Sequence, residues 1–195
     1  MIEKILQEIN EDKHTNPATT SNNFKRDLWD FCIETNLNGT AVEFGTHKGQ
    51  TTRVLSYLFD KVYTFNLPGN FDKAIVLNND RDNIEYIGVD LYKTSVNEEF
   101  FTSQVSLFLI DAGHSTDNVL TDFTRAINMP LSDTVYFVFD DYGLIYDVKT
   151  AIDSLIEFGK LEVVREIGQP KGYDFKNGRI LQLGSEGLIC KLIKD

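Results

Sequence analysis

The sequence predicts an α/β fold built on a doubly wound, mostly parallel sheet with helices on both faces. Short β-like runs alternate with helical stretches from about residue 40 to 157, and parallel strands need crossover connections of this kind. The uninterrupted apolar runs "SLFLI" and "VYFVF" are typical of central strands that are covered on both faces. The last two apolar runs, "LEVVREI" and "RILQLGSEGLICKLI", have no helix between them. We therefore expect at least one antiparallel strand at the C-terminal edge.

The N-terminal part is expected to be helical on both sides of a loop. Four apolar residues at helical spacing predict a short amphipathic helix: Ile2, Ile5, Leu6 and Ile9. The polar stretch "NEDKHTNPATTSNN" predicts a loop, and residues 24–36 predict a second helix that "NLNGT" ends. The first helix packs either on its own domain or on another copy, so it is a hint of self-association.

The alternating part begins after this helix. The expected strands, in chain order, are "AVEFG", "KVYTFN", "IEYIGV", "SLFLID" and "TVYFVFDD". The expected helices are "QTTRVLSYLF", "VNEEFFTS", "STDNVLTDFTRAI" and "YDVKTAIDSLIEF", while "LPGNFDKAIVLNNDRDN" is expected to be a polar loop. Nothing marks a repeat or a second domain, so the 195 residues are expected to form one domain.

Composition excludes several classes of protein. With 42% hydrophobic residues the chain can build a core, and its net charge of −11 should repel phosphate backbones and anionic membranes. Cys32 and Cys190 lack C-x-x-C spacing, which argues against a disulfide scaffold or a cysteine zinc site. The chain shows neither a secretory signal pattern nor a run long enough to span a bilayer. We expect a cytoplasmic protein that binds neither nucleic acid nor membrane.

Ligands of such sheets bind beyond the carboxyl ends of the strands, so the residues there are the candidates. They are Glu43 to Gly45, Asn66, Gly88 to Asp90, Asp111 to His114, and Asp140 to Tyr142. In "VEFGTHKGQTT", Gly45 and Gly49 allow the chain to turn sharply and a ligand to approach the backbone. Their G-x-x-x-G spacing matches neither a dinucleotide motif nor a Walker loop. Glu43 suits a cationic or amine-bearing ligand, although a turn without a ligand remains the alternative.

Acidic residues end two later strands. Asp111 follows "FLI", and Asp140 with Asp141 follows "VYFVF", so their carboxylates should meet at one edge. Such a cluster needs protons or a cation to compensate it, and Mg²⁺ with oxygen ligands fits. The alternative is that these residues cap the following helices.

The histidines are candidates of unequal strength. His114 opens the helix after Asp111, where it could accept a proton from a reacting group. It is alternatively a satisfied polar loop residue. His14 lies in a polar loop and His47 inside the glycine turn, so both have weaker cases.

These motifs resemble a known family. "VEFGTHKGQTT", "FLIDAGHSTDNVLTDF" and "VYFVFDDYGLIYDVKTAID" are similar to motifs of the Rossmann-like S-adenosylmethionine-dependent methyltransferases, in particular the metal-dependent small-molecule subgroup related to macrocin and catechol O-methyltransferases. The resemblance covers about residues 40–157. It implies a cofactor-binding core over 40–195, with residues 1–38 as a helical extension or lid.

The resemblance also implies roles for single residues. The methionine end of the cofactor would be lined by Glu43, Gly45, Thr46 and Gly49, with Glu43 facing the amino group. Asn66 would hold the ribose without the usual acid, and Asp90 would lie near the adenine. Asp111 would contact the cofactor and, with Asp140 and Asp141, bind the metal. Some sugar methyltransferases carry an acid as candidate base where Gly113 stands here, so His114 is the expected base.

The expected activity is transfer of a methyl group to a hydroxyl of a small metabolite such as a sugar, assisted by Mg²⁺. The acceptor pocket would be walled by the N-terminal segment, by the loop "LPGNFDKAIVLNNDRDN" and by the loop "GQPKGYDFKNG", whose Lys171, Tyr173 and Lys176 could meet a polar or acidic acceptor. A cofactor-binding or scaffold protein without turnover is the alternative, because of Asn66 and Gly113.

Overall fold

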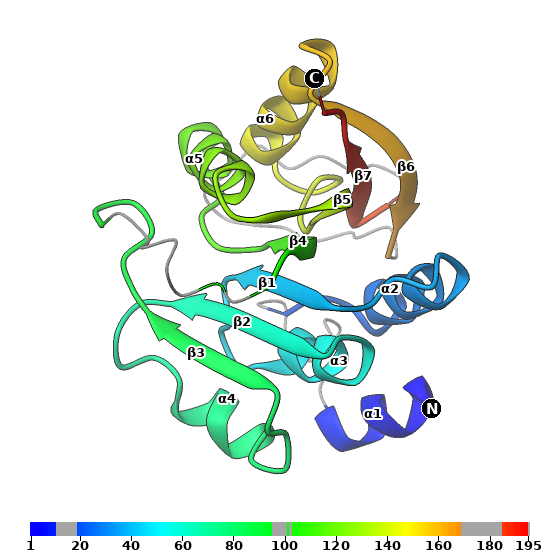
Figure 1. Ribbon diagram of the computed structural model, residues 1–195, viewed down its shortest axis with the longest axis vertical. Coiled ribbons are helices and arrows are strands. Elements are labelled where there is room, and N and C mark those ends of the chain that lie inside the picture. The colour runs from blue at the N-terminus through cyan, green and yellow to red at the C-terminus, as the bar shows by residue number, and fades with distance from the viewer. Residues whose placement is uncertain (11–18, 95–100, 102, 169–184, 195) are drawn as a thin grey trace.

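A computed structural model describes residues 1–10, 19–94, 101, 103–168 and 185–194. Its strands form one sheet in the order β3-β2-β1-β4-β5-β7-β6 (Figure 1). The strands are β1 (Thr40–Phe44), β2 (Lys61–Asn66), β3 (Ile84–Gly88), β4 (Val105–Ile110), β5 (Leu131–Phe139), β6 (Leu161–Ile167) and β7 (Gly187–Leu192). β7 runs antiparallel to β5 and β6, while β1 to β5 pair in parallel. The predicted doubly wound fold with an antiparallel C-terminal strand is therefore confirmed.

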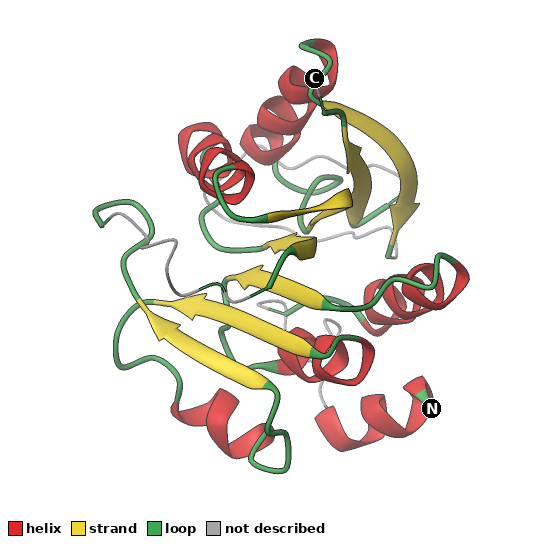
Figure 2. Ribbon diagram, in the orientation of Figure 1, coloured by secondary structure: helices red, strands yellow, loops and turns green. Residues whose placement is uncertain are grey.

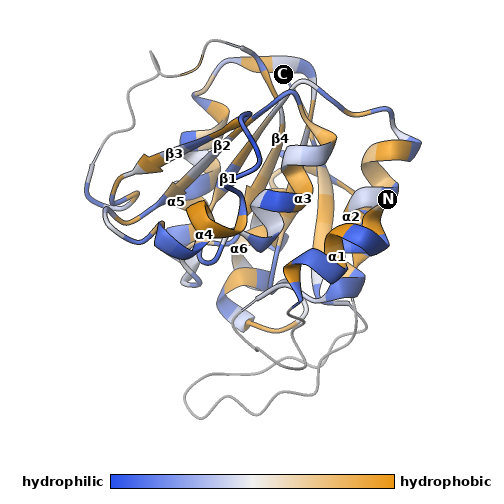
Figure 3. Ribbon diagram, turned by 90° about the horizontal axis from the view of Figure 1, so that it is seen from below, coloured by the Kyte–Doolittle hydropathy of each residue, from blue (hydrophilic) through white to orange (hydrophobic). Residues whose placement is uncertain are grey.

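Helices cover both faces of this sheet (Figure 2). They are α1 (Ile2–Ile9), α2 (Asn22–Glu34), α3 (Gln50–Leu58), α4 (Asp72–Leu77), α5 (Thr116–Ile127) and α6 (Tyr146–Glu157). Successive residues of β1 point to opposite faces: Val42 and Phe44 join the core under α5 and α6, whereas Ala41 joins the core under α2 and α3. α1 and α3 carry hydrophobic and hydrophilic residues in alternation (Figure 3), as expected for helices with one buried face.

Two elements differ from the sequence-based expectation, and a third is not tested. α4 lies inside the stretch that was expected to be a polar loop, where Ala74 is fully buried. α2 begins at Asn22, inside the other expected loop, because the Ser21 hydroxyl accepts a hydrogen bond from the Phe24 amide and caps the helix there. Most of the helix expected over 96–103 lies outside the described residues, as do His14 and the loop that carries Lys171, Tyr173 and Lys176.

The N-terminal helix packs on its own domain. Ile5, Leu6 and Ile9 are buried against Val54 of α3, so the apolar face that hinted at self-association is covered by the same chain. Assembly into a homo-oligomer stays a prediction.

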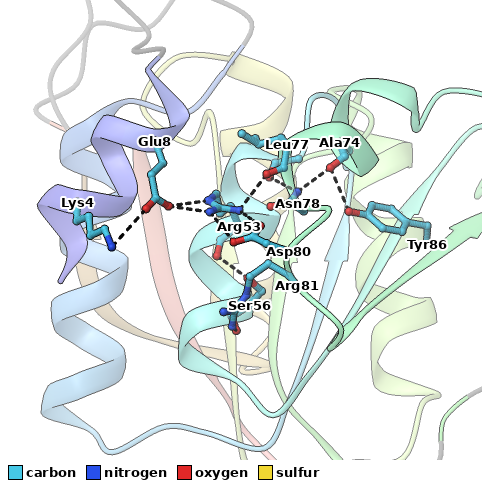
Figure 4. A network of polar contacts seen from close by, with 11 residues as sticks. Lys4, Glu8, Arg53, Ser56, Ala74, Leu77, Asn78, Asp80, Arg81 and Tyr86 are labelled. Atoms are coloured by element: carbon cyan, nitrogen blue, oxygen red, sulfur yellow. Dashed lines mark hydrogen bonds and ion pairs between the residues drawn. The ribbon is translucent and has the colours of Figure 1, made fainter.

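The guanidinium of Arg53 connects this helix to α3 and to the segment after α4 (Figure 4). Arg53 of α3 lies 2.7 Å from Glu8 of α1 and 2.8 Å from Asp80, and it donates to the Leu77 carbonyl at the end of α4. The hydrogen bond that Arg53 donates to Asp80 raises the pKa of Arg53 above its ordinary value. One side chain therefore links α1, α3 and the segment after α4.

No helix in the described ranges combines the length and the apolar character needed to cross a membrane.

Candidate functional site

A cavity of about 830 Å³ opens at the carboxyl ends of the five parallel strands. Each of these strands contributes lining residues at or just after its end: Gly45, Asn66, Asp90, Asp111, and Asp140 with Asp141. His114 also lines the cavity. The structure therefore brings most of the candidate residues around one space, as expected for parallel strands that end at the same edge.

The two glycines of the turn serve different purposes. Gly45 has a φ of 104°, and a Cβ there would lie 2.0 Å from the Asp111 carbonyl oxygen, so only glycine allows the ends of β1 and β4 to come this close. Gly49 has a φ of 76°, and its Cβ would lie 2.7 Å from the Ala74 side chain on α4. Gly45 lines the cavity, whereas Gly49 packs against a helix and does not.

Glu43 lies behind this turn and is not among the residues that line the cavity. It is 1% exposed, and its carboxyl contacts the hydroxyls of Thr52 and Thr64, each at 2.5 Å. Burial raises the pKa of Glu43 to about 8, so the carboxyl is mostly neutral at pH 7. Thr46 is also buried, and its hydroxyl contacts that of Thr64 at 2.6 Å. The contact between Glu43 and the amino group of a cofactor, which the resemblance implies, stays a prediction.

Two carboxylates and an imidazole meet on the cavity wall. His114 Nε2 lies 3.4 Å from Asp141 Oδ2 and 3.9 Å from Asp111 Oδ1, and one donor atom from each residue lies within 4.8 Å of the others. We call these three residues the His114 cluster. Asp140 is buried and lines the cavity but does not belong to this group.

Asp141 reaches the cluster through an unusual backbone conformation. Its φ is 59°, the left-handed region that non-glycine residues seldom adopt, and its carbonyl accepts the amides of Leu144 and Ile145. The next residue, Tyr142, donates a hydrogen bond to Asp153 of α6 at 2.9 Å. The residue that follows Asp141 therefore anchors this turn on α6.

The residues expected near the ribose and adenine already have partners. The Asn66 side chain accepts from the Leu67 amide and donates to the Asn70 carbonyl. Asp90 lies 3.0 Å from Lys93, whose hydrogen bond lowers the pKa of Asp90. A ligand that used either side chain would compete with these contacts.

Residues that sequence reasoning did not single out also line the wall, among them Lys48, Tyr92 and Ile145, whereas Asp72 and Lys73 come from the stretch "LPGNFDKAIVLNNDRDN" that was expected to wall the acceptor pocket. Tyr92 donates to Asp122 of α5 at 3.1 Å, and burial raises the pKa of Asp122 to about 7. Gly113 faces this pair, because a Cβ there would lie 2.4 Å from Tyr92 Oη. The space that an acidic side chain at 113 would need is thus filled. No motif marked Tyr92, since its role depends on residues far away in the sequence.

Comparison with known proteins supports the fold. No protein-family model and no curated protein sequence matches the chain, but many solved structures do. An O-methyltransferase from Bacillus cereus in complex with S-adenosylhomocysteine is 15% identical, with a TM-score of 0.67 over 99% of this chain and 90% of that one. The N-methyltransferase NodS from Bradyrhizobium japonicum, in complex with the same compound, is 15% identical, with a TM-score of 0.62 over 98% and 96%.

An rRNA methylase from Streptococcus thermophilus is 16% identical, with a TM-score of 0.56 over 86% of this chain and 94% of that one. At this level of identity the likeness shows the fold alone, which is that of the Rossmann-like S-adenosylmethionine-dependent methyltransferases. The three proteins are described as O-, N- and rRNA methylating enzymes, so the fold does not define the acceptor.

Proposed function

We propose that the protein is an S-adenosylmethionine-dependent methyltransferase that acts on a hydroxyl of a small metabolite such as a sugar, assisted by a divalent ion. One observation carries the proposal: the His114 cluster lies on the wall of the same cavity that begins at the Gly45 turn. A donor bound along the turn and an acceptor held at the cluster would share one space.

The three side chains of the cluster would hold a metal ion after a small movement. Ligand atoms about 2.1 Å from one ion lie roughly 3 to 3.5 Å apart. The separation of 3.4 Å in the cluster lies in this range, and the separation of 3.9 Å would have to shorten. Asp111 and Asp141 are two of the three ligands predicted from the sequence, and His114 takes the place of Asp140 in this donor set. An ion held there would polarise an acceptor hydroxyl and lower its pKa.

The donor set bears on which ion binds. Carboxylates suit Mg²⁺, whereas an imidazole nitrogen favours first-row transition ions such as Mn²⁺. We therefore extend the proposed metal from Mg²⁺ to Mn²⁺.

The presence of these donors favours oxygen as the methyl acceptor. A neutral amine is nucleophilic without help, but a sugar hydroxyl must lose its proton. In the proposed reaction the bond from sulfur to methyl carbon breaks as the bond from carbon to acceptor oxygen forms, and S-adenosylhomocysteine leaves. When an ion occupies the cluster, the hydroxyl proton, made more acidic by the ion, would pass to solvent. His114 is the candidate acceptor when its imidazole is not bound to an ion.

Isothermal titration with S-adenosylmethionine, in the presence and absence of Mg²⁺ or Mn²⁺, tests the first part of the proposal. Absence of binding at millimolar cofactor would refute it. Transfer of a labelled methyl group to a panel of sugars and other hydroxylated compounds tests the second part. Cofactor binding without turnover on any of them would favour the alternative, a binding protein with a methyltransferase fold.

A further inference from the structure

The hydroxyls around Glu43 form a continuous path from this acid to the glycine turn. Thr46 Oγ1 lies 3.1 Å from the Phe65 carbonyl oxygen and 2.6 Å from Thr64 Oγ1. Thr64 Oγ1 and Thr52 Oγ1 each lie 2.5 Å from Glu43 Oε2. All three threonines are at most 3% exposed. Water is therefore excluded from this path, and its contacts must be satisfied by its own hydrogens.

Counting these hydrogens distinguishes the two forms of Glu43. The path has four contacts between oxygen atoms, and the three threonine hydroxyls supply three hydrogens. When Glu43 is ionised, Thr52 and Thr64 both donate to it. The one remaining hydrogen, on Thr46, then has two acceptors, Thr64 Oγ1 at 2.6 Å and the Phe65 carbonyl oxygen at 3.1 Å, and donation across the shorter contact leaves the Phe65 carbonyl without it. When Glu43 is protonated, its own hydrogen goes to Thr64, Thr64 donates to Thr46, and Thr46 donates to Phe65.

The last contact of the path is also an anchor of the turn. The Phe65 carbonyl accepts the backbone amides of Gly45 and Thr46, at 3.0 and 3.1 Å. Gly45 lines the cavity. The protonation state of Glu43 therefore changes how firmly the cavity wall is held, although Glu43 itself does not reach the cavity.

We propose that Glu43 is a positioning residue that holds the Gly45 turn in its binding conformation by donating a proton into the path through Thr64 and Thr46. This inference rests on the proposed function, because the turn is taken to hold the methyl donor. It replaces the expected charge contact between Glu43 and the donor's amino group with an indirect role of the neutral acid.

Neighbouring groups act on the pKa of Glu43 in both directions. Burial is the largest effect and raises the pKa to about 8, the hydroxyls of Thr52 and Thr64 lower it when they donate to the carboxylate, and the Asp111 carboxylate, at the end of β4, raises it. Tyr86 of β3 is the other titratable group that interacts with Glu43, and burial raises the pKa of Tyr86 as well. Neither group supplies a positive charge that would keep Glu43 ionised at neutral pH.

The test measures the affinity for S-adenosylhomocysteine by isothermal titration between pH 6 and 9.5. We expect the wild-type affinity to fall about three- to tenfold through pH 8, which is the contribution of one hydrogen bond. Glu43→Gln, whose amide can donate to Thr64 at any pH, should keep a constant affinity. The control is Glu85→Gln, which alters an acid paired with Lys61 on the surface and should follow the wild type.

Thr46→Val separates the path from a direct charge effect. It removes the last hydroxyl of the path but leaves Glu43 to titrate, so we expect the pH dependence of affinity to vanish. A wild-type affinity that is constant with pH, a Glu43→Gln variant that follows the wild type, or a Thr46→Val variant that keeps the pH dependence would overturn the proposal.

Thermal unfolding provides a readout without a ligand. A raised pKa in the folded state favours folding at low pH, and this stabilisation is lost as pH rises from the unfolded value near 4.5 to about 8. The melting temperature of the wild type should therefore fall relative to Glu43→Gln across this window and stay level above it. If neither the wild type nor any variant binds S-adenosylhomocysteine, the proposed function fails. The difference in melting temperature between the wild type and Glu43→Gln still decides whether Glu43 is neutral. A difference that does not change with pH would overturn the proposal.

Discussion

Two clusters in this protein each place two acids around one basic side chain, which is an arginine in one cluster and a histidine in the other. The Arg53 cluster consists of Glu8, Arg53 and Asp80, with contacts of 2.7 and 2.8 Å. In the His114 cluster the corresponding distances are 3.4 and 3.9 Å. A guanidinium stays charged at every ordinary pH and forms several directed hydrogen bonds, whereas an imidazole is charged only when protonated.

The difference separates a structural cluster from a candidate functional one. Arg53 keeps its positive charge at every ordinary pH and is 6% exposed between three elements of the fold, and its two acids, 31% and 53% exposed, reach water as well. The His114 cluster faces the cavity with two acids and a conditional base. An ion or a proton from a substrate can complete its balance of charge. The presence of two acids and one basic residue does not by itself distinguish the two clusters.

The largest expected effect comes from Asp111→Asn. It removes a charged ligand from the His114 cluster, so we expect Mn²⁺ binding to be lost and methyl transfer to fall about 100-fold or more. The melting temperature should not fall, because two acids no longer repel each other. Asp133→Asn, on an exposed part of β5, is the matched control. Full turnover in the Asp111→Asn variant would refute the metal role.

Arg53→Met tests the other cluster. Removing a buried partner from an ion pair is costly, but Glu8 and Asp80 are 31% and 53% exposed and regain water. We expect the free energy of unfolding in urea to fall by about 2 kcal/mol. Arg165→Met, which removes an exposed pair with Glu34, should cost only about 0.5 kcal/mol. Equal losses of unfolding free energy in the two variants would show that the Arg53 cluster stabilises the fold no more than an exposed ion pair does.

His114→Gln tests which ion the His114 cluster prefers. It exchanges the imidazole for an amide, so Mn²⁺ affinity should fall about tenfold and Mg²⁺ affinity by much less. Titration calorimetry with each ion measures both values. His47→Gln serves as control, since His47 lines the cavity but lies outside the cluster. Equal losses for both ions would contradict a role of the imidazole in choosing the ion.

The smallest effect is expected for Glu8→Gln. It weakens one of the two ion pairs of Arg53, while Ile5, Leu6 and Ile9 keep α1 in place. We expect a loss of about 0.5 kcal/mol in the free energy of unfolding at low ionic strength, and a smaller loss in 1 M salt. Urea unfolding at two salt concentrations measures it. A loss as large as that of Arg53→Met would mean that α1 is held chiefly by charge.

The sequence predicted the edge of the sheet where the candidate residues meet. Parallel strands end together, so residues that follow apolar runs had to converge, and Asp111 and Asp141 do. The short helix α4 was missed because its six residues stand in a polar context. The need for Gly49 depends on the contact with this helix, which no local pattern reveals.

Side-chain directions at the site were harder to predict. β1 is buried on both faces, so no alternation of polar and apolar residues shows on which side Glu43 lies. Asp140 and Asp141 are adjacent, and only the positive φ of Asp141 decides which one joins His114. That angle is set by the packing of the turn on α6, which is a tertiary effect.

The left-handed backbone at Asp141 also bears on how this chain can change over generations. Such a conformation costs an ordinary residue about 1 kcal/mol or more, and glycine or asparagine would adopt it more easily. Replacement of Asp141 by glycine or asparagine would therefore raise the stability of the folded protein, and it would remove a carboxylate from the cavity. Retention of aspartate at this position among descendants would mark selection for activity, and its replacement by glycine would mark lineages released from that selection.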